Sequence, residues 1–125
     1  MLYTSYLSNL KNLPKDSVKI LITKWKGKID INKYNLLWRP QLSPDDLYQW
    51  KNGAISKEEM FYKFENKLES NISQEAINEI IEYLNNDKDV YLICYCKELH
   101  ECHRRIVANY IGDKANIKWK EYKEE

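Results

Sequence analysis

Two apolar runs rich in β-branched residues are the strongest constraint on this fold, because three helical patterns lie between them. Residues 18–25 (Val-Lys-Ile-Leu-Ile-Thr-Lys-Trp) and residues 89–94 (Asp-Val-Tyr-Leu-Ile-Cys) are typical of buried strands. Strands that alternate with helices pair in parallel. The 125 residues are the length of one domain. The sequence therefore predicts a single α/β domain over residues 1–125, with a mostly parallel sheet flanked by helices in a Rossmann-like, three-layer arrangement.

The three helices between these strands have recognisable starts. Ser43 and Pro44 open a short helix that stops at residues 52–53. Ser56 to Glu59 is a capping box. Ser73 is the predicted cap of the third helix. The other elements expected are a strand at 1–7, a helical turn at 8–13, an irregular segment at 28–41, a helix at 102–111, a strand at 115–119 and a frayed tail at 120–125.

The net charge and the apolar pattern limit which cellular compartment and which binding partners are expected. The formal net charge is +1, which does not support a polyanionic partner, so nucleic acid is not favoured. No segment has the length of a membrane span, and the amino terminus lacks the pattern of a signal peptide. Three clustered cysteines without an export signal are expected to be reduced thiols. A cytoplasmic protein without membrane contact is therefore expected.

Residues 94–105 hold all three cysteines, both histidines and two of the three arginines. This stretch runs from the end of a predicted strand through a loop into a predicted helix. In parallel sheets, ligands bind beyond the carboxyl ends of the strands, where loops meet helix N-termini. The position and the composition of the stretch therefore both predict a ligand site.

The start of the predicted helix suggests chemistry for Cys102, His103 and Arg104. Free amide groups and the helix dipole favour an anion there, and neighbouring positive charge lowers a thiol pKa. Cys102 is therefore expected to be a thiolate near neutral pH, and Cys102 or His103 to act as a nucleophile or acid–base group. Arg104 is expected to hold an anion. These three are the predicted catalytic residues, although each also has a purely structural interpretation.

Five further residues are candidate ligand-binding residues. Cys94 and Cys96 would share one face if the strand extended that far, and Cys94 is as plausible a small core residue. Arg39 is a second candidate for holding the anion, and Tyr6 a candidate pocket wall. Arg105 is a further basic candidate, with a solvated helix position as its alternative. No resident cofactor or metal is expected.

Zinc is an open alternative to a thiol site. Five residues able to ligate zinc lie within ten positions, namely Cys94, Cys96, His100, Cys102 and His103. Structural zinc is usually held by two ligand pairs with a longer segment between them, which this single stretch does not provide. The spacing also excludes a Cys-x-x-Cys redox pair, a phosphate-binding Walker loop and the zinc-deaminase signature.

The motifs of the chain resemble those of the domain of unknown function 488 family. The resemblance rests on residues 94–97 (Cys-Tyr-Cys-Lys) and 102–105 (Cys-His-Arg-Arg), and less specifically on residues 3–6, 13–14 and 42–64. Members typically carry Cys-Tyr-Glu-Lys, so Cys96 replaces a glutamate and cannot copy a carboxylate. The resemblance implies a small cytosolic α/β protein of bacteria or their phages, with a polar pocket around Cys-His-Arg. It implies no settled reaction.

Three functions remain open from the sequence. The first is an anion-binding pocket, with or without enzymatic activity, for a small phosphorylated or nucleotide-like ligand. The second is a non-catalytic module that binds nucleic acid or protein through Trp38, Tyr48 and Trp50, if these are exposed. The third is a small zinc-binding domain.

Overall fold

The computed structural model describes residues 1–96, 99 and 102–122, and its centre is a five-stranded sheet in which every strand pairing is parallel. The strand order is β3-β2-β4-β1-β5. The strands are β1 (Leu2–Tyr6), β2 (Val18–Leu21), β3 (Leu36–Trp38), β4 (Val90–Cys94) and β5 (Trp119–Glu121). The α-helices are α1 (Leu47–Lys51), α2 (Lys57–Lys67), α3 (Asn71–Asn85) and α4 (His103–Ala115), and the 3-10 helices are η1 (Leu7–Asn12) and η2 (Pro40–Leu42). The predicted single α/β domain is confirmed.

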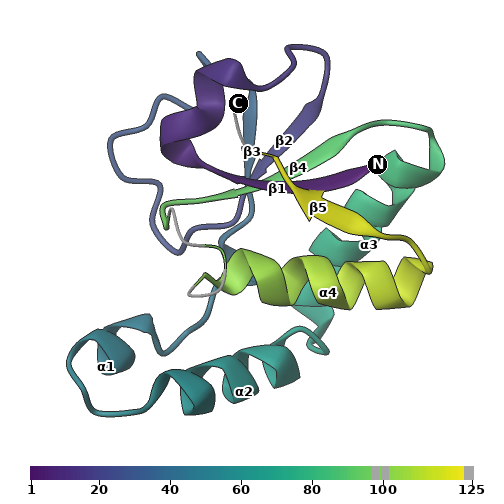
Figure 1. Ribbon diagram of the computed structural model, residues 1–125. Helices are drawn as coiled ribbons and strands as arrows, with labels where there is room; N and C mark the ends of the chain where they lie inside the picture. Colours follow the sequence, from purple (N-terminus) through teal and green to yellow (C-terminus); the bar gives the residue numbers. More distant parts are fainter. Residues whose placement is uncertain (97–98, 100–101, 123–125) are drawn as a thin grey trace.

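The two faces of the sheet are covered differently. Figure 1 shows the long helices on one side of the sheet and η1 on the other. The main core lies on the helical side, where Leu92 of β4 and Ile20 of β2 pack among side chains of α2, α3 and α4. A smaller core around Tyr91 and Ile93 is covered by η1 and by part of the segment between β2 and β3. Because β4 is buried on both faces, its sequence is continuously apolar.

Local sequence signals set some element boundaries and miss others. Helix α1 begins at Leu47 with Asp46 as its N-cap, and not at the predicted start, since Ser43 is the C-cap of η2. Ser56 caps α2, and its hydroxyl accepts a hydrogen bond of 3.0 Å from the Glu59 amide, as the capping box predicts. The cap of α3 is Ser70 rather than Ser73, which lies inside the helix, where its hydroxyl donates to the Gln41 carbonyl at 3.0 Å. Helix α4 continues past Gly112 to Ala115, and its C-cap residue Asn116 adopts the left-handed conformation.

Three strands differ from the sequence prediction. Strand β2 ends at Leu21, whereas the predicted strand runs to residue 25. Residues 36–38 lie in the segment predicted to be irregular, yet they form β3. Strand β5 begins at Trp119, where the predicted strand ends, and includes Glu121 of the predicted frayed tail. Strands β3 and β5 are three-residue edge strands, and so short a segment carries no clear alternation of its own. Their formation depends on β2 and β1, which offer free edges for pairing.

None of the helices in the described part of the chain combines the length and apolar character needed to span a membrane.

Candidate functional site

The three thiols gather where β4 ends and α4 begins. Cys94 is the last residue of β4, and Cys102 is the N-cap residue of α4 with extended backbone angles. The Sγ atoms of Cys94, Cys96 and Cys102 all lie within 4.8 Å of one another, and we call these three residues the thiol cluster. All three are free thiols; Cys94 and Cys102 are buried, whereas Cys96 is exposed. The cluster therefore joins the edge of the core to the surface.

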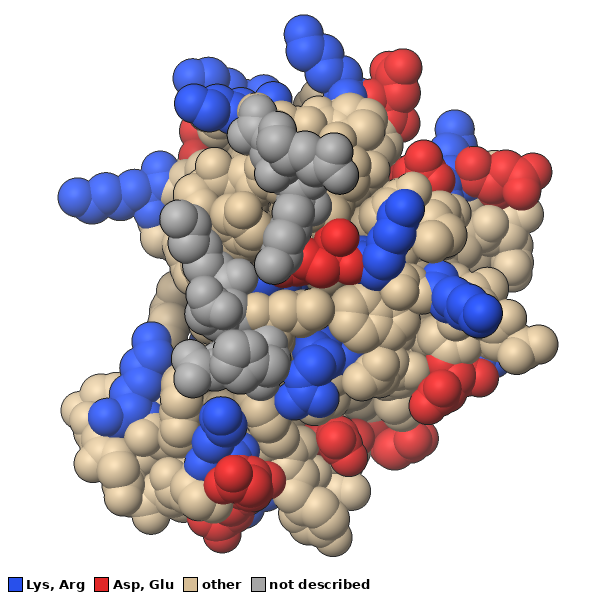
Figure 2. Space-filling model, in the orientation of Figure 1, with Lys and Arg blue, Asp and Glu red and all other residues tan. Residues whose placement is uncertain are grey.

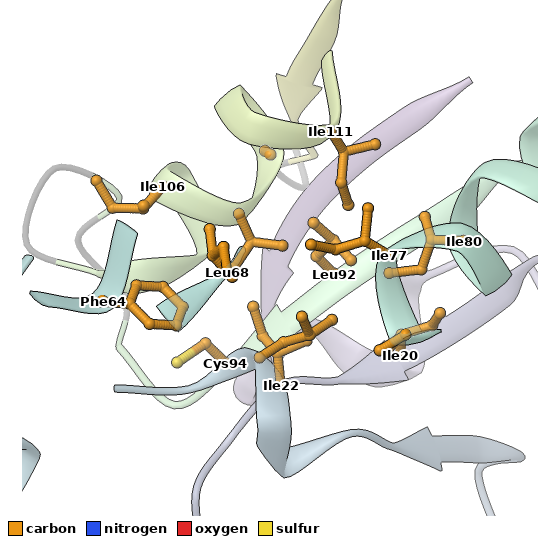
Figure 3. Close-up of a cluster of buried hydrophobic side chains, with 14 of the residues drawn as sticks. Ile20, Ile22, Phe64, Leu68, Ile77, Ile80, Leu92, Cys94, Ile106 and Ile111 are labelled. Atoms are coloured by element: carbon orange, nitrogen blue, oxygen red, sulfur yellow. The ribbon is translucent and has the colours of Figure 1, made fainter. Parts of the chain in front are cut away.

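Cys94 also belongs to the hydrophobic core, as its structural interpretation predicts. Figure 3 shows it at the margin of the main core, near Phe64 and Ile22. Its Sγ lies 3.7 Å from Nδ1 and 3.8 Å from Nε2 of His103. Cys94 thus fills core volume and presents its sulfur to polar neighbours at the same time.

The thiol cluster concentrates negative charge on Cys96 rather than on Cys102. Hydrogen bonds with Cys102 and Cys94 hold the pKa of Cys96 well below its usual range, and the nearby His103 and Arg104 act in the same direction. For Cys102, the bond with Cys94 lowers the pKa, but the bond with Cys96 and burial outweigh it and raise the value to about 11. The prediction that the pKa of Cys102 is lowered is therefore wrong, because its sulfur is buried and stabilises a neighbouring thiolate.

His103 is buried and held in one orientation. Its Nε2 lies 2.5 Å from the carbonyl oxygen of Ile22, and its ring packs edge-on against Phe64 at a centroid distance of 5.6 Å. A carbonyl oxygen only accepts, so Nε2 carries the proton of this bond. Burial lowers the pKa of His103 to about 4, so the ring is neutral near pH 7 and Nδ1 bears the free lone pair.

Arg104 is buried and paired with an acid, which conflicts with its predicted role as an anion clamp. Its Nη2 donates to Oε2 of Glu121 at 2.6 Å and its Nε donates to Oε1 at 3.1 Å. Its Nη1 donates to the carbonyl oxygen of Cys96. The guanidinium therefore fixes the backbone beside the thiol cluster, and Glu121 neutralises its charge. Arg104 is a positioning residue in this arrangement.

The other candidate residues lie in different surroundings. Arg39 forms a bidentate pair with Glu79 of α3, with both bonds at 2.8 Å. Arg105 lies over the ring of Phe61 at 5.7 Å and lines a separate groove between α2 and α4. Tyr6 pairs with Cys94 in the sheet register and lies 5.9 Å from the Arg104 guanidinium. His100 lies outside the described residues. The structure thus brings Tyr6, but neither Arg39 nor Arg105, next to the cluster.

A small pocket opens onto the thiol cluster, and we call it the thiol pocket. Its volume is about 80 Å³. Cys94, Cys96 and His103 line it, together with Tyr95. Its remaining wall includes Trp25 after β2, Trp50 and Lys51 of α1, and Lys24. Aromatic faces, two lysines and the thiols therefore surround one space at the carboxyl end of β4.

Sequence reasoning missed the residues that complete this site. Glu121 lies in a tail with no apolar pattern, and only the pairing of β5 with β1 places it beside Arg104. Lys24, Trp25 and Lys51 carry no motif that links them to residues 94–103. The one available signal was the rule that residues after parallel strands meet at one edge, which applies to Lys24 and Trp25 after β2.

The fold and the site define an α/β protein with a thiol-lined pocket at the carboxyl end of a parallel sheet. The sequence matches the family DUF488-N3a, described as the active DUF488-N3 subclade, over residues 2–115. The chain belongs to this family, and the resemblance inferred from residues 94–105 is confirmed. The comparison with curated proteins found no match, and neither did the comparison with solved structures.

Proposed function

We propose that the thiol pocket binds a small phosphorylated or nucleotide-like molecule and holds its reacting group next to the thiol cluster. The observation that carries the proposal is the convergence of Trp25, Trp50 and two lysines on the opening of the thiol cluster. A ligand in this pocket meets Cys94, Cys96 and His103. Of the residues predicted to be catalytic, His103 lines the pocket. Cys102 and Arg104 do not line it, but both contact Cys96, which does.

The aromatic side chains suit a planar group. Trp25 is 54% exposed and Tyr95 is 51% exposed, which is unusual for such large apolar rings. The Tyr95 hydroxyl donates to the Lys26 carbonyl at 3.0 Å, which holds that ring in place. Stacking on an aromatic side chain contributes about 1–3 kcal/mol per nucleobase. The exposed rings therefore offer a surface for a base or a similar ring.

The lysines replace Arg104 as the groups that hold an anion. Lys24 lies over the Trp25 ring at 5.3 Å, and its Nζ donates to the Asp45 carbonyl at 2.8 Å. Lys51 is exposed at the end of α1. Among the described residues that line this pocket there is no acid, so the two ammonium groups give this part of the wall a positive character. This character favours a phosphate at the pocket opening.

The size of the pocket limits what enters it. A volume of about 80 Å³ is well below the 300–1,000 Å³ of typical sites for drug-sized ligands. The space fits the reacting group of a ligand rather than a whole nucleotide. The rest of the molecule would lie across the exposed face of Trp25.

The free thiols favour a reducing compartment. Three thiols within 4.8 Å of one another, one of them exposed, are readily oxidised in an oxidising compartment. We therefore propose that the protein acts in the cytoplasm.

Tryptophan fluorescence tests the proposal. Metal-free protein is titrated with a nucleoside monophosphate, the matching nucleoside and inorganic phosphate. The monophosphate is expected to change the emission, and Lys51→Ala to weaken its binding by about tenfold, equivalent to ~1.4 kcal/mol. Lys88→Ala, in the turn at the opposite end of β4, is the matched control and is expected to leave binding unchanged. A protein that responds to neither monophosphate nor phosphate contradicts the proposal.

The same titration separates this function from a non-catalytic binding module. That alternative needed exposed Trp38, Tyr48 and Trp50, but Trp38 is partly buried and its Nε1 donates to the Thr23 carbonyl at 2.9 Å. Trp50 is partly buried and lines the thiol pocket, which leaves Tyr48, at 64% exposure. Figure 2 shows basic and acidic side chains spread together over the viewed face. Binding of an oligonucleotide without binding of the mononucleotide would favour the module.

A further inference from the structure

We propose that Cys94, Cys96 and Cys102 together bind one thiophilic divalent cation, of which Zn²⁺ is the representative, with its fourth coordination position facing the thiol pocket. The inference deepens the proposed function, because such an ion would meet the ligand there. The binding of the ion by the thiols does not itself depend on that function. The thiols are then ligands of the ion rather than free nucleophiles.

The separation of the sulfur atoms fits a single ion. Zinc binds thiolate sulfur at about 2.3 Å, so three sulfurs around a tetrahedral ion lie about 3.8 Å apart. The three Sγ atoms here are all within 4.8 Å of one another, so each separation needs to close by about 1 Å at most. Rotation of the exposed Cys96 side chain can shorten its separations from Cys94 and Cys102 by this amount.

The fold removes the objection that the sequence spacing raised. Structural zinc sites usually take two ligand pairs from separate segments, and residues 94–102 look like one short segment. In the structure, Cys94 belongs to the end of β4 and Cys102 to the N-cap of α4, so two different elements supply them. Cys96 lies two residues beyond the end of the strand and adds the third sulfur. The end of β4 and the start of α4 lie close together, and this proximity creates the cluster.

Neighbouring groups support the negative charge of three thiolates. The amide groups in the first turn of α4 lie next to Cys102, and a helix N-terminus favours negative charge. Arg104 donates through Nη1 to the Cys96 carbonyl and so fixes the backbone that carries Cys96, while Glu121 balances the Arg104 charge. His103 lies against Cys94, with Nε2–H bound to the Ile22 carbonyl.

The open side of the cluster gives the ion an entry path and a free position. Cys96 is exposed, and both Cys94 and Cys96 line the thiol pocket. Sites with three protein ligands and one open position are typical of catalytic rather than structural zinc. The open position would take a water molecule or an oxygen or nitrogen atom of the ligand.

Cobalt(II) substitution tests the inference on the full chain. The reduced, metal-free protein is titrated with Co²⁺ and then with Zn²⁺, while circular dichroism monitors the fold. We expect a thiolate-to-cobalt charge-transfer absorption that saturates at one ion per chain, visible bands of tetrahedral cobalt, and displacement by Zn²⁺. Cys96→Ser removes one of three thiolates, so the charge-transfer intensity is expected to fall by about a third. Because Cys96 is exposed, this variant decides the question even if Cys94→Ser or Cys102→Ser unfolds.

Lys51→Ala is the matched control, since it alters the pocket opening and keeps all three thiols. It is expected to bind cobalt with an unchanged spectrum. Absence of the charge-transfer band in folded protein, or an unchanged band in folded Cys96→Ser, overturns the metal site. Because nucleotide binding is measured on metal-free protein, a protein that binds cobalt but no nucleotide contradicts the proposed function alone. A protein that binds the nucleotide but no cobalt contradicts the metal site alone.

Discussion

The carboxylate of Glu121 and the guanidinium of Arg104 form a buried, bidentate ion pair that joins β5 to the first turn of α4. The two bonds measure 2.6 and 3.1 Å, and the side chains are 7% and 0% exposed. The hydroxyl of Thr4 also donates to Glu121, at 2.6 Å. Through the third nitrogen of Arg104 this network reaches the Cys96 carbonyl. A continuous chain of hydrogen bonds therefore connects the edge strand β5 to the backbone at the thiol cluster.

Glu121→Gln is expected to destabilise the protein strongly. The substitution leaves the Arg104 charge buried without its counter-charge, which costs about 3 kcal/mol or more. Urea denaturation measures the change in the free energy of unfolding. Lys63→Gln is the control, because the Lys63–Asp46 pair is 3.9 Å long and its lysine is half exposed, so about 0.5 kcal/mol is expected. Equal losses in the two variants would show that Glu121 does not stabilise Arg104.

Cys96 is expected to be alkylated first in metal-free protein. It is the exposed member of the thiol cluster, whereas Cys94 and Cys102 are buried and need an opening of the structure before they react. Mass spectrometry of peptides after timed treatment with iodoacetamide gives the rate at each cysteine. Prior addition of Zn²⁺ is expected to suppress the reaction at Cys96. Faster alkylation of Cys102 than of Cys96 would contradict the observed burial.

Tyr91 is expected to make stability fall at alkaline pH. Its ring is buried and stacks on Tyr3 at 4.6 Å, and burial raises the pKa of Tyr91 to about 12. A raised pKa means that the unfolded chain loses this proton first, near pH 10. The contribution of Tyr91 is therefore complete below pH 10 and is lost as the pH rises towards 12.

The comparison of wild type with Tyr91→Phe isolates this contribution from the other tyrosines and the lysines. The difference in unfolding free energy between pH 9 and pH 12 is expected to be about 2–3 kcal/mol smaller in the variant. Parallel pH profiles of the two proteins would contradict the assignment.

Two glycines with positive φ provide a matched test of the wall of the thiol pocket. Gly27 has φ +66°, and an added Cβ would overlap the Tyr95 hydroxyl; Gly53 has φ +78°, and nothing lies within 4 Å of an added Cβ. In both alanine variants, backbone strain destabilises the folded protein by about 1 kcal/mol. Gly27→Ala also displaces the Tyr95 ring and its bond to the Lys26 carbonyl, which costs about 1 kcal/mol more.

Ligand binding and thermal unfolding distinguish the two glycine variants. Gly27→Ala is expected to weaken nucleotide binding, because the displaced Tyr95 is part of the pocket wall. Gly53→Ala is expected to lower stability without weakening nucleotide binding. Equal binding by the two variants would mean that Tyr95 does not shape the ligand site.

Much of the fold follows from local sequence patterns. The apolar run of residues 89–94 predicts a strand buried on both faces, and β4 is such a strand. The Ser56–Glu59 capping box predicts the start of α2, because a side-chain cap needs only three residues of chain. The alternation of strands and helices predicts a parallel sheet, since such connections return each strand in the same direction. Signals of this kind act within a few residues and are readable without a structure.

The composition of residues 94–105 placed the candidate site, but the tertiary structure decided the role of each residue. The sequence located Cys94, Cys96, Cys102, His103 and Arg104 at one strand–helix junction. The hydrogen bond with Cys96 and burial then raised the pKa of Cys102 instead of lowering it, and pairing with Glu121 turned Arg104 from an anion clamp into a positioning residue. The remaining pocket walls come from the residues that follow β2 and from α1, far away in the sequence. Charge, burial and pairing depend on contacts between distant segments, and for that reason only the folded chain determined them.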